Sequence, residues 1–252
     1  MRLLVLLFAI TMPLVAWLSG RAAFGPDTAT VSDRHPTLLV AAGYAFSIWG
    51  LIFLLDLLYA AWQATGVRRR DPLLGRVALP AAAGFALTAA WMPLFSQGLF
   101  WLCLVVIFGA LACLAWSALQ LARPATHAPA WLALSLHAGW LSLAAFLNLA
   151  QAIVAYRLLP DGAMLGWSLA LFAAAAAVLL GLNQRMHGNT AYAAAALWGL
   201  GAVYVKQSQS GLDGSDAAAW AALAIGLLLG LQTAWLRWRE RRRPVAVLPP
   251  PG

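Results

Sequence analysis

Several polar residues lie inside segments that are otherwise almost entirely apolar. Asp56 is near the middle of the stretch GYAFSIWGLIFLLDLLYAAWQ (residues 43–63), and Thr88, His137 and Asn148 interrupt two later apolar segments. A carboxylate and an imidazole can exchange protons, whereas a hydroxyl and a carboxamide donate and accept hydrogen bonds. Together these residue types could form a buried hydrogen-bond network, a proton relay or the polar part of a binding site.

Aromatic residues share predicted helix faces with these polar groups. Trp49, Phe53 and Asp56 have the i, i+4, i+7 spacing of one helical face, and similar spacings recur around Thr88 and around His137. A stripe that faced lipid would not carry such polar groups, because polar residues in membrane spans turn inward. The candidate site residues are Trp49, Phe53, Asp56, Thr88, Trp91, Phe95, His137, Trp140, Ala144 and Asn148.

The helices that must position these residues are predicted from composition. Of the 252 residues, 63% are hydrophobic and 10% are charged, whereas soluble domains carry about 25% charged residues. The apolar residues form runs of about 18 or more, long enough to cross a bilayer as helices. We therefore expect an all-α, polytopic transmembrane bundle of about eight spans. These are residues 3–20, 38–62, 77–96, 98–122, 130–156, 163–183, 190–206 and 216–236.

The basic residues predict the orientation of the bundle. With the N-terminus in the cytoplasm, twelve basic residues lie inside: Arg2, Arg68, Arg69, Arg70, Arg76, Arg123, Arg185, Arg237, Arg239, Arg241, Arg242 and Arg243. The outer side receives Arg21, Arg34, Arg157 and Lys206. This asymmetry follows the positive-inside rule and predicts an integral membrane protein with both termini cytoplasmic, most simply in a bacterial inner (plasma) membrane. The basic run RWRERRRP is then a topology anchor, with an anionic-lipid site as the alternative. The net charge of +8 does not indicate a nucleic-acid partner.

Motifs of soluble enzymes are absent from the sequence. There is no phosphate-binding glycine loop and no HExxH, CxxC or GxSxG motif, and the histidines lack metal-ligand spacing. Glu240, the only glutamate, lies in the basic tail. We therefore expect neither catalysis nor a metal centre.

Tryptophan is the most over-represented residue type, with 13 copies. Most lie near span ends, where indole rings favour the membrane interface. Trp49, Trp91 and Trp140 lie deeper and on three different spans. A buried indole needs a partner for its N–H, so this set predicts an aromatic-lined cavity.

Three motifs resemble one known family. WLSLAAFLN (residues 140–148), TAAWMPLF (residues 88–95) and YAFSIWGLIF (residues 44–53) resemble patterns in the fifth, third and second helices of the tryptophan-rich sensory protein family, also called translocator protein or peripheral benzodiazepine receptor. They occur in the family's order over about residues 1–156. The second-helix pattern is one residue shorter and lacks its proline, and Thr88 replaces an asparagine.

The resemblance implies a function and a division of the chain. It implies a five-helix membrane domain over residues 1–158, followed by an accessory three-helix segment at 159–238 and a basic, then proline-rich, cytoplasmic tail at 239–252. The family implies binding of a tetrapyrrole such as a porphyrin, and in some members a sterol, for sensing, transport or regulation. The loop at 21–36 would be a lid over the site, as the first loop is in that family.

Alternatives to this interpretation stay open. Asp56 and His137 could titrate in a small-solute or proton-coupled transporter, or the chain could have a purely structural role. Leu200, Tyr204 and Lys206 formally match a sterol-contact pattern. Gly226 and Gly230 form a GxxxG motif, which indicates either a contact within the chain or a homodimer. The expected partners are the lipid bilayer and a small amphipathic ligand.

Overall fold

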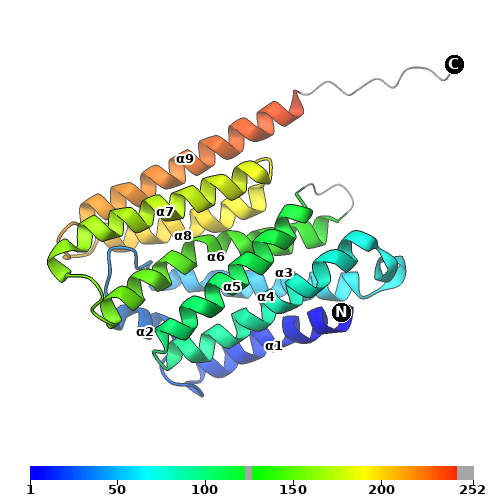
Figure 1. The fold of residues 1–252 in the computed structure, drawn as a ribbon, viewed down its shortest axis with the longest axis horizontal. Coiled ribbons are helices and arrows are strands. Elements are labelled where there is room, and N and C mark those ends of the chain that lie inside the picture. The colour runs from blue at the N-terminus through cyan, green and yellow to red at the C-terminus, as the bar shows by residue number, and fades with distance from the viewer. Residues whose placement is uncertain (123–126, 243–252) are drawn as a thin grey trace.

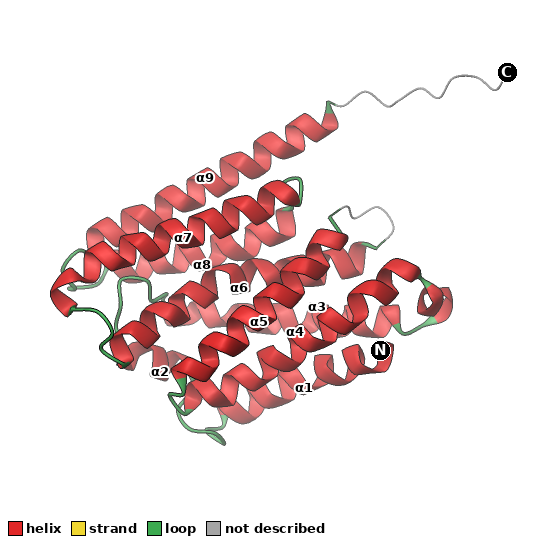
Figure 2. Ribbon diagram, viewed as in Figure 1, coloured by secondary structure: helices red, strands yellow, loops and turns green. Residues whose placement is uncertain are grey.

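The computed structural model describes residues 1–122 and 127–242, and all regular structure in them is helical (Figure 2). The long helices are α1 (Arg2–Gly20), α3 (Ile48–Gln63), α4 (Pro72–Ser96), α5 (Phe100–Gln120), α6 (Ala128–Ala155), α7 (Met164–Arg185), α8 (Thr190–Ser208) and α9 (Ser215–Arg241). The short elements are α2 (Thr28–Arg34) and the 3-10 helices η1 (Gly43–Ser47), η2 (Gly66–Arg70) and η3 (Asp161–Ala163). The all-α helical bundle predicted from the sequence is confirmed.

Seven helices among the described residues are long and apolar enough to cross a membrane: α1, η1 together with α3, α4, α5, α6, α7 and α9. The prediction was about eight spans, and the helix that does not meet these length and hydropathy limits is α8, whose crossing stays a prediction. With 19 residues α8 is long enough, but its glycines, tyrosines and polar end lower its hydropathy. α8 packs between α6 and α9, so neighbouring helices shield much of its surface.

α6 is the centre of the bundle. It packs against α3, α5, α7 and α8, and 72% of its most apolar window is buried, against 22% for α1 and for α7. Figure 1 shows α1 along one edge of the bundle and α9 along the opposite edge, with α6 between them. A polar residue on the inner faces of α6 is therefore shielded from lipid on every side.

Small residues let α8 approach α6 closely. A Cβ atom at Gly139 of α6 would overlap the carbonyl oxygen of Tyr192 on α8. A Cβ at Gly199 of α8 would lie 3.3 Å from the Trp140 ring. Only glycine allows backbones to come this near, and the indole of Trp140 is held between the two helices as a result.

The N-terminus and the end of α9 lie at the same end of the bundle (Figure 1). At this end Asp71 caps α4 by accepting a hydrogen bond from the Leu74 backbone N–H at 2.9 Å, and its carboxylate also lies 2.9 Å from Nε2 of His127. The Leu74 hydrogen bond, with a smaller effect from His127, lowers the pKa of Asp71. The tail at 243–252 and Arg123 lie outside the described residues, so the predicted proline-rich segment is not described.

Candidate functional site

Asp56, His137 and Thr88 form one buried hydrogen-bonded chain across three helices. The Asp56 carboxyl on α3 lies 2.8 Å from Nδ1 of His137 on α6. Nε2 of the same ring lies 3.3 Å from the Thr88 hydroxyl on α4. The side chains of Asp56 and His137 are fully buried. The prediction that Asp56 faces the bundle and contacts a neighbouring helix is confirmed.

The hydrogen bonds of this chain determine where its protons lie. The Thr88 hydroxyl donates its single hydrogen to the carbonyl of Gly84 at 2.9 Å, so toward His137 it acts as an acceptor. Nε2 of His137 is then the protonated nitrogen, and the pair is neutral when one further proton lies between Nδ1 and the Asp56 carboxyl. The pair has no net charge whichever atom holds that proton, which explains how a carboxyl group is accommodated at this depth.

Trp49 joins this polar chain to an aromatic cluster. Its ring stacks on Phe53, with centroids 5.4 Å apart, and makes an edge contact with His137 at 5.7 Å. It also lies 6.3 Å from the Trp91 ring and 5.9 Å from the Trp140 ring. The three deep tryptophans therefore meet in one place, as their positions on three spans predicted.

Trp91 is fixed by a hydrogen bond as well as by packing. Its indole N–H donates to Oδ1 of Asn148 on α6 at 2.8 Å, and its ring stacks on Phe95 at 4.6 Å. Trp91 and Asn148 are 6% and 2% exposed, so this bond is made away from solvent. The bond ties α4 to α6.

A small, largely enclosed cavity lies at the centre of the aromatic cluster. Its volume is about 30 Å³, which is room for about two water molecules. Its wall consists of Ser32, Val40, Phe46, Trp49, Trp91, Phe95, Ile107, Trp140, Ala144, Leu147, Asn148 and Gln151. Sites for drug-sized ligands measure about 300–1,000 Å³, so the conformation described is a closed one.

Two buried donors in the cavity wall have no hydrogen-bond partner among the described residues. They are the indole N–H of Trp140 and the amide nitrogen of Asn148. An unpaired buried donor costs about 1–3 kcal/mol. Since both residues line the cavity, a molecule bound there would gain most by presenting hydrogen-bond acceptors.

Part of the cavity wall comes from the segment between α1 and η1. Residues 27–42, which we call the cover segment, contain α2 and contribute Ser32 and Val40 to the wall. The side-chain amide of Gln151 on α6 donates to the Ser32 hydroxyl at 2.8 Å. Asp27 caps α2 through the backbone N–H of Thr30 at 3.1 Å. The predicted lid loop at 21–36 therefore lies against the site.

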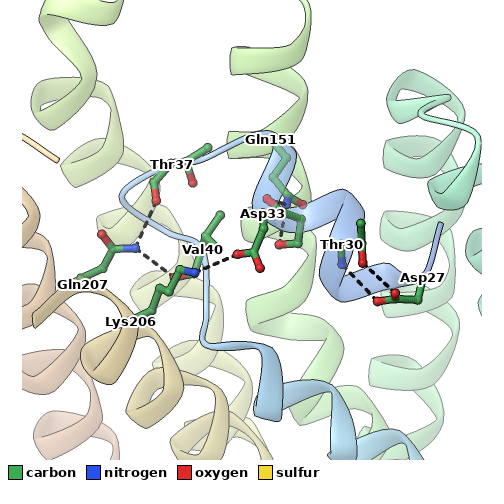
Figure 3. Close-up of polar contacts among 9 residues, drawn as sticks. Asp27, Thr30, Asp33, Thr37, Val40, Gln151, Lys206 and Gln207 are labelled. Atoms are coloured by element: carbon green, nitrogen blue, oxygen red, sulfur yellow. Dashed lines mark hydrogen bonds and ion pairs between the residues drawn. The ribbon is translucent and has the colours of Figure 1, made fainter. Parts of the chain in front are cut away.

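The C-terminal end of α8 holds the cover segment in place (Figure 3). The side-chain amide of Gln207 donates to the carbonyls of Thr37 at 3.1 Å and Val40 at 3.0 Å. Lys206 makes an ion pair with Asp33 at 2.8 Å. Gln207 is 1% exposed, whereas the ion pair is solvent-exposed and contributes little. The main tether is therefore Gln207.

His35 provides a further contact between the cover segment and the bundle. Its ring makes an edge contact with Phe100 on α5, with centroids 5.0 Å apart. Burial, with a smaller effect from Arg34, lowers the pKa of His35 below its usual value. The imidazole therefore stays neutral against the Phe100 ring over a wider range of pH.

The family model for TSPO-like protein matches residues 2–235. The chain belongs to the TSPO-like protein family. The match includes α7, α8 and most of α9 as well as the five-helix part that contains the three sequence motifs. No curated protein and no solved structure matches the chain. The division predicted at residue 158 stays a prediction, although α8 in this TSPO-like chain packs directly on α6 and on the cover segment.

The structure separates the predicted site residues of this TSPO-like protein into two groups. Six of them line the cavity: Trp49, Trp91, Phe95, Trp140, Ala144 and Asn148. The other four, Phe53, Asp56, Thr88 and His137, are not in its wall. Phe53 lies behind the Trp49 ring, and the other three form the buried polar chain. These four residues lie close to the cavity but outside its wall, and their part in ligand binding stays a prediction.

The remaining wall residues were not predicted as part of the site. Phe46 and Leu147 lie one helical turn from Trp49 and Ala144, so periodicity could have found them. Gln151 shares the face of Asn148. Ser32 comes from the short helix α2, Val40 from the non-helical stretch after it, and Ile107 from an entirely apolar face of α5, so no pattern in the sequence marks them.

Proposed function

We propose that this membrane protein binds a flat amphipathic ligand, with a tetrapyrrole such as a porphyrin as the first candidate and a sterol as the second. The observation that carries the proposal is the enclosed wall of three tryptophans with two unpartnered N–H donors. Indole and phenyl walls favour a flat π-system, and the donors favour a ligand with carboxylate or carbonyl groups. The role would be sensing, transport or regulation rather than catalysis.

Binding such a ligand requires the closed cavity to expand. The cover segment lies outside the long helices, and side-chain hydrogen bonds from Gln151 and Gln207 hold it. Segments of this kind open at lower free energy than packed helices. We infer that the ligand enters as the cover segment lifts from α6 and α8.

A ligand screen tests the proposal. Purified protein should gain thermal stability with porphyrins, haem, bile pigments or sterols, by about 5–10 °C at 100 times the dissociation constant. Ala144→Leu fills the cavity and should remove the shift. Ala173→Leu, at an exposed position of α7, is the matched control and should keep it. A shift that survives Ala144→Leu, or the absence of any shift, would exclude this cavity as the site.

A proton-coupled transporter is the alternative function, and the buried Asp56–His137 pair is the observation that favours it. Asp56→Asn should then abolish proton-dependent uptake into proteoliposomes. If Asp56→Asn instead leaves porphyrin binding intact and no uptake is found, the binding function is favoured.

The end of the bundle that holds the N-terminus and the end of α9 is called the basic end. We further propose that this end faces the cytoplasm of a bacterial cell, with both termini inside. The support is the distribution of twelve basic residues against four.

The homodimer expected as an alternative from Gly226 and Gly230 has less support. A Cβ at Gly226 would lie 3.6 Å from Leu197 of the same chain, so that glycine serves a contact within the chain.

A further inference from the structure

A continuous groove runs between α8 and α9 on the outside of the bundle. Its wider part, about 700 Å³, is lined by residues that include Thr190, Arg237, Trp238 and Arg241. Its narrower part, about 430 Å³, is lined almost only by apolar atoms, from Leu200, Tyr204 and Leu227 among others. Leu197 and Gly230 line both parts, so the two volumes join.

The groove is polar at one end and apolar along the rest. α8 begins at Thr190, and Arg237 and Arg241 are in the last turns of α9, so the polar part lies at the basic end of the bundle. From Thr190 to Tyr204 the groove follows α8 for about 21 Å. One leaflet of a bilayer has about 15 Å of hydrocarbon, so the apolar part is long enough for an acyl chain.

The groove faces the region that lipid occupies. Leu227 and Leu231 of α9 are 60% and 67% exposed, and Trp238 is 50% exposed. Figure 1 shows α9 at the outer edge of the bundle. A Cβ at Gly230 would meet nothing within 4 Å, which leaves the groove open where its two parts join.

The charges at the polar end suit a phosphate. Arg237 forms an ion pair with Glu240 at 3.4 Å. Among the described residues, Arg241 has no ion pair. Guanidinium groups bind phosphate oxygens in a bidentate manner, and the N-terminal end of α8 adds the positive end of a helix dipole. In contrast, Arg239 stacks over the Trp235 ring and does not line the groove.

We propose that the α8–α9 groove binds one anionic phospholipid of the leaflet at the basic end. Its phosphate lies between Arg237 and Arg241, and one acyl chain lies along Leu197, Leu200 and Tyr204. A positive-inside anchor alone requires basic residues but no groove, so the apolar channel that continues from the two arginines is what distinguishes a binding site. The site is separate from the tryptophan-lined cavity.

Native mass spectrometry of the full chain with added phospholipids tests this site. Phosphatidylglycerol should bind about tenfold more tightly than phosphatidylcholine with the same acyl chains, with one molecule retained. Arg237→Gln with Arg241→Gln should remove this preference. Arg69→Gln with Arg239→Gln loses the same charge at the same end of the bundle and should keep it.

A second pair of variants tests the acyl channel. Gly230→Leu blocks the junction of the groove and should release the lipid. Gly181→Leu on α7, where a Cβ also meets nothing within 4 Å, should not. The proposal would be overturned if both double arginine variants lost the lipid preference equally, or if phosphatidylglycerol and phosphatidylcholine bound equally well. It would also be overturned if the protein were a dimer that Gly230→Leu dissociates. Displacement of the lipid by a sterol at equal concentration would overturn it too.

Discussion

At the scale of single residues, the polar groups inside the bundle are tolerated because they are paired with each other. Asp56 and His137 lie 2.8 Å apart, close enough to share one proton, and with that proton the pair carries no net charge. An unpaired charge at the centre of a span costs about 2.5–3.5 kcal/mol on the insertion scale. Sharing a proton avoids that cost, although Oδ1 of Asp56 has no hydrogen-bond partner among the described residues.

A double-mutant cycle measures this pairing. Asp56→Leu and His137→Leu should each lower the free energy of unfolding by about 1–3 kcal/mol, because each leaves a buried polar partner unpaired. The double substitution should cost less than the sum, with a coupling of about 1–2 kcal/mol. Reversible unfolding in mixed micelles gives the values. All variants should stay in the membrane fraction. If the effects of the two single substitutions simply add, the hydrogen bond contributes nothing to stability.

At the scale of elements, α8 determines how firmly the cavity is closed. Its Gln207 bonds two carbonyls of the cover segment, 167 and 170 residues earlier in the chain. A segment predicted as an accessory to the first five helices therefore takes part in closing the site.

Hydrogen exchange of residues 27–42 tests this role of α8. Gln207→Ala removes two buried hydrogen bonds and should speed exchange in the cover segment about tenfold. Lys206→Ala breaks only the exposed ion pair and should change the rate less than about threefold. Similar rates in the two variants, or acceleration confined to α8 itself, would mean that Gln207 does not hold the cover.

The parts of the site that could be predicted are those governed by helical periodicity. The spacing of Trp91, Phe95 and of Trp140, Ala144, Asn148 placed these residues on inner faces, and they line the cavity. Periodicity cannot distinguish a residue in the wall from one just behind it. Thr88 and His137 lie on the same faces but one or two turns away, where the helices are already in contact and leave no space.

The contacts of the cover segment could not be predicted for a different reason. Ser32 and Val40 lie in a connection whose path depends on hydrogen bonds to Gln151 and Gln207, far away in sequence. The size of the cavity was also beyond prediction, because it depends on how the rings of Trp49, Trp91 and Trp140 pack against one another.

At the scale of the whole molecule, the eight long helices alternate in direction, so the start of α1 and the end of α9 lie at the same, basic end of the bundle (Figure 1). α8 decides the topology, since seven helices are clearly apolar enough to span. If α8 also spans the membrane, the segment that precedes it in the chain and the segment that follows it lie on opposite sides of the membrane.

Reporter fusions at three positions test the topology. A reporter after residue 187 should be cytoplasmic, a reporter after residue 212 should be outside, and one at the C-terminus should be cytoplasmic again. The physical reason is the basic asymmetry together with the packing of α8 against both α6 and α9. The same side for the reporters at 187 and 212 would mean that α8 does not cross.

The central claim is that the tryptophan-lined cavity opens to take a flat ligand, and quenching of tryptophan fluorescence by a porphyrin measures this most directly. Wild-type protein in detergent should show saturable quenching. Trp140→Phe removes a cavity donor and should weaken the affinity about tenfold. Trp235→Phe, at a 48% exposed position outside the cavity wall, should leave it unchanged. Equal effects of the two substitutions, or quenching that never saturates, would show partitioning into the micelle and contradict the account.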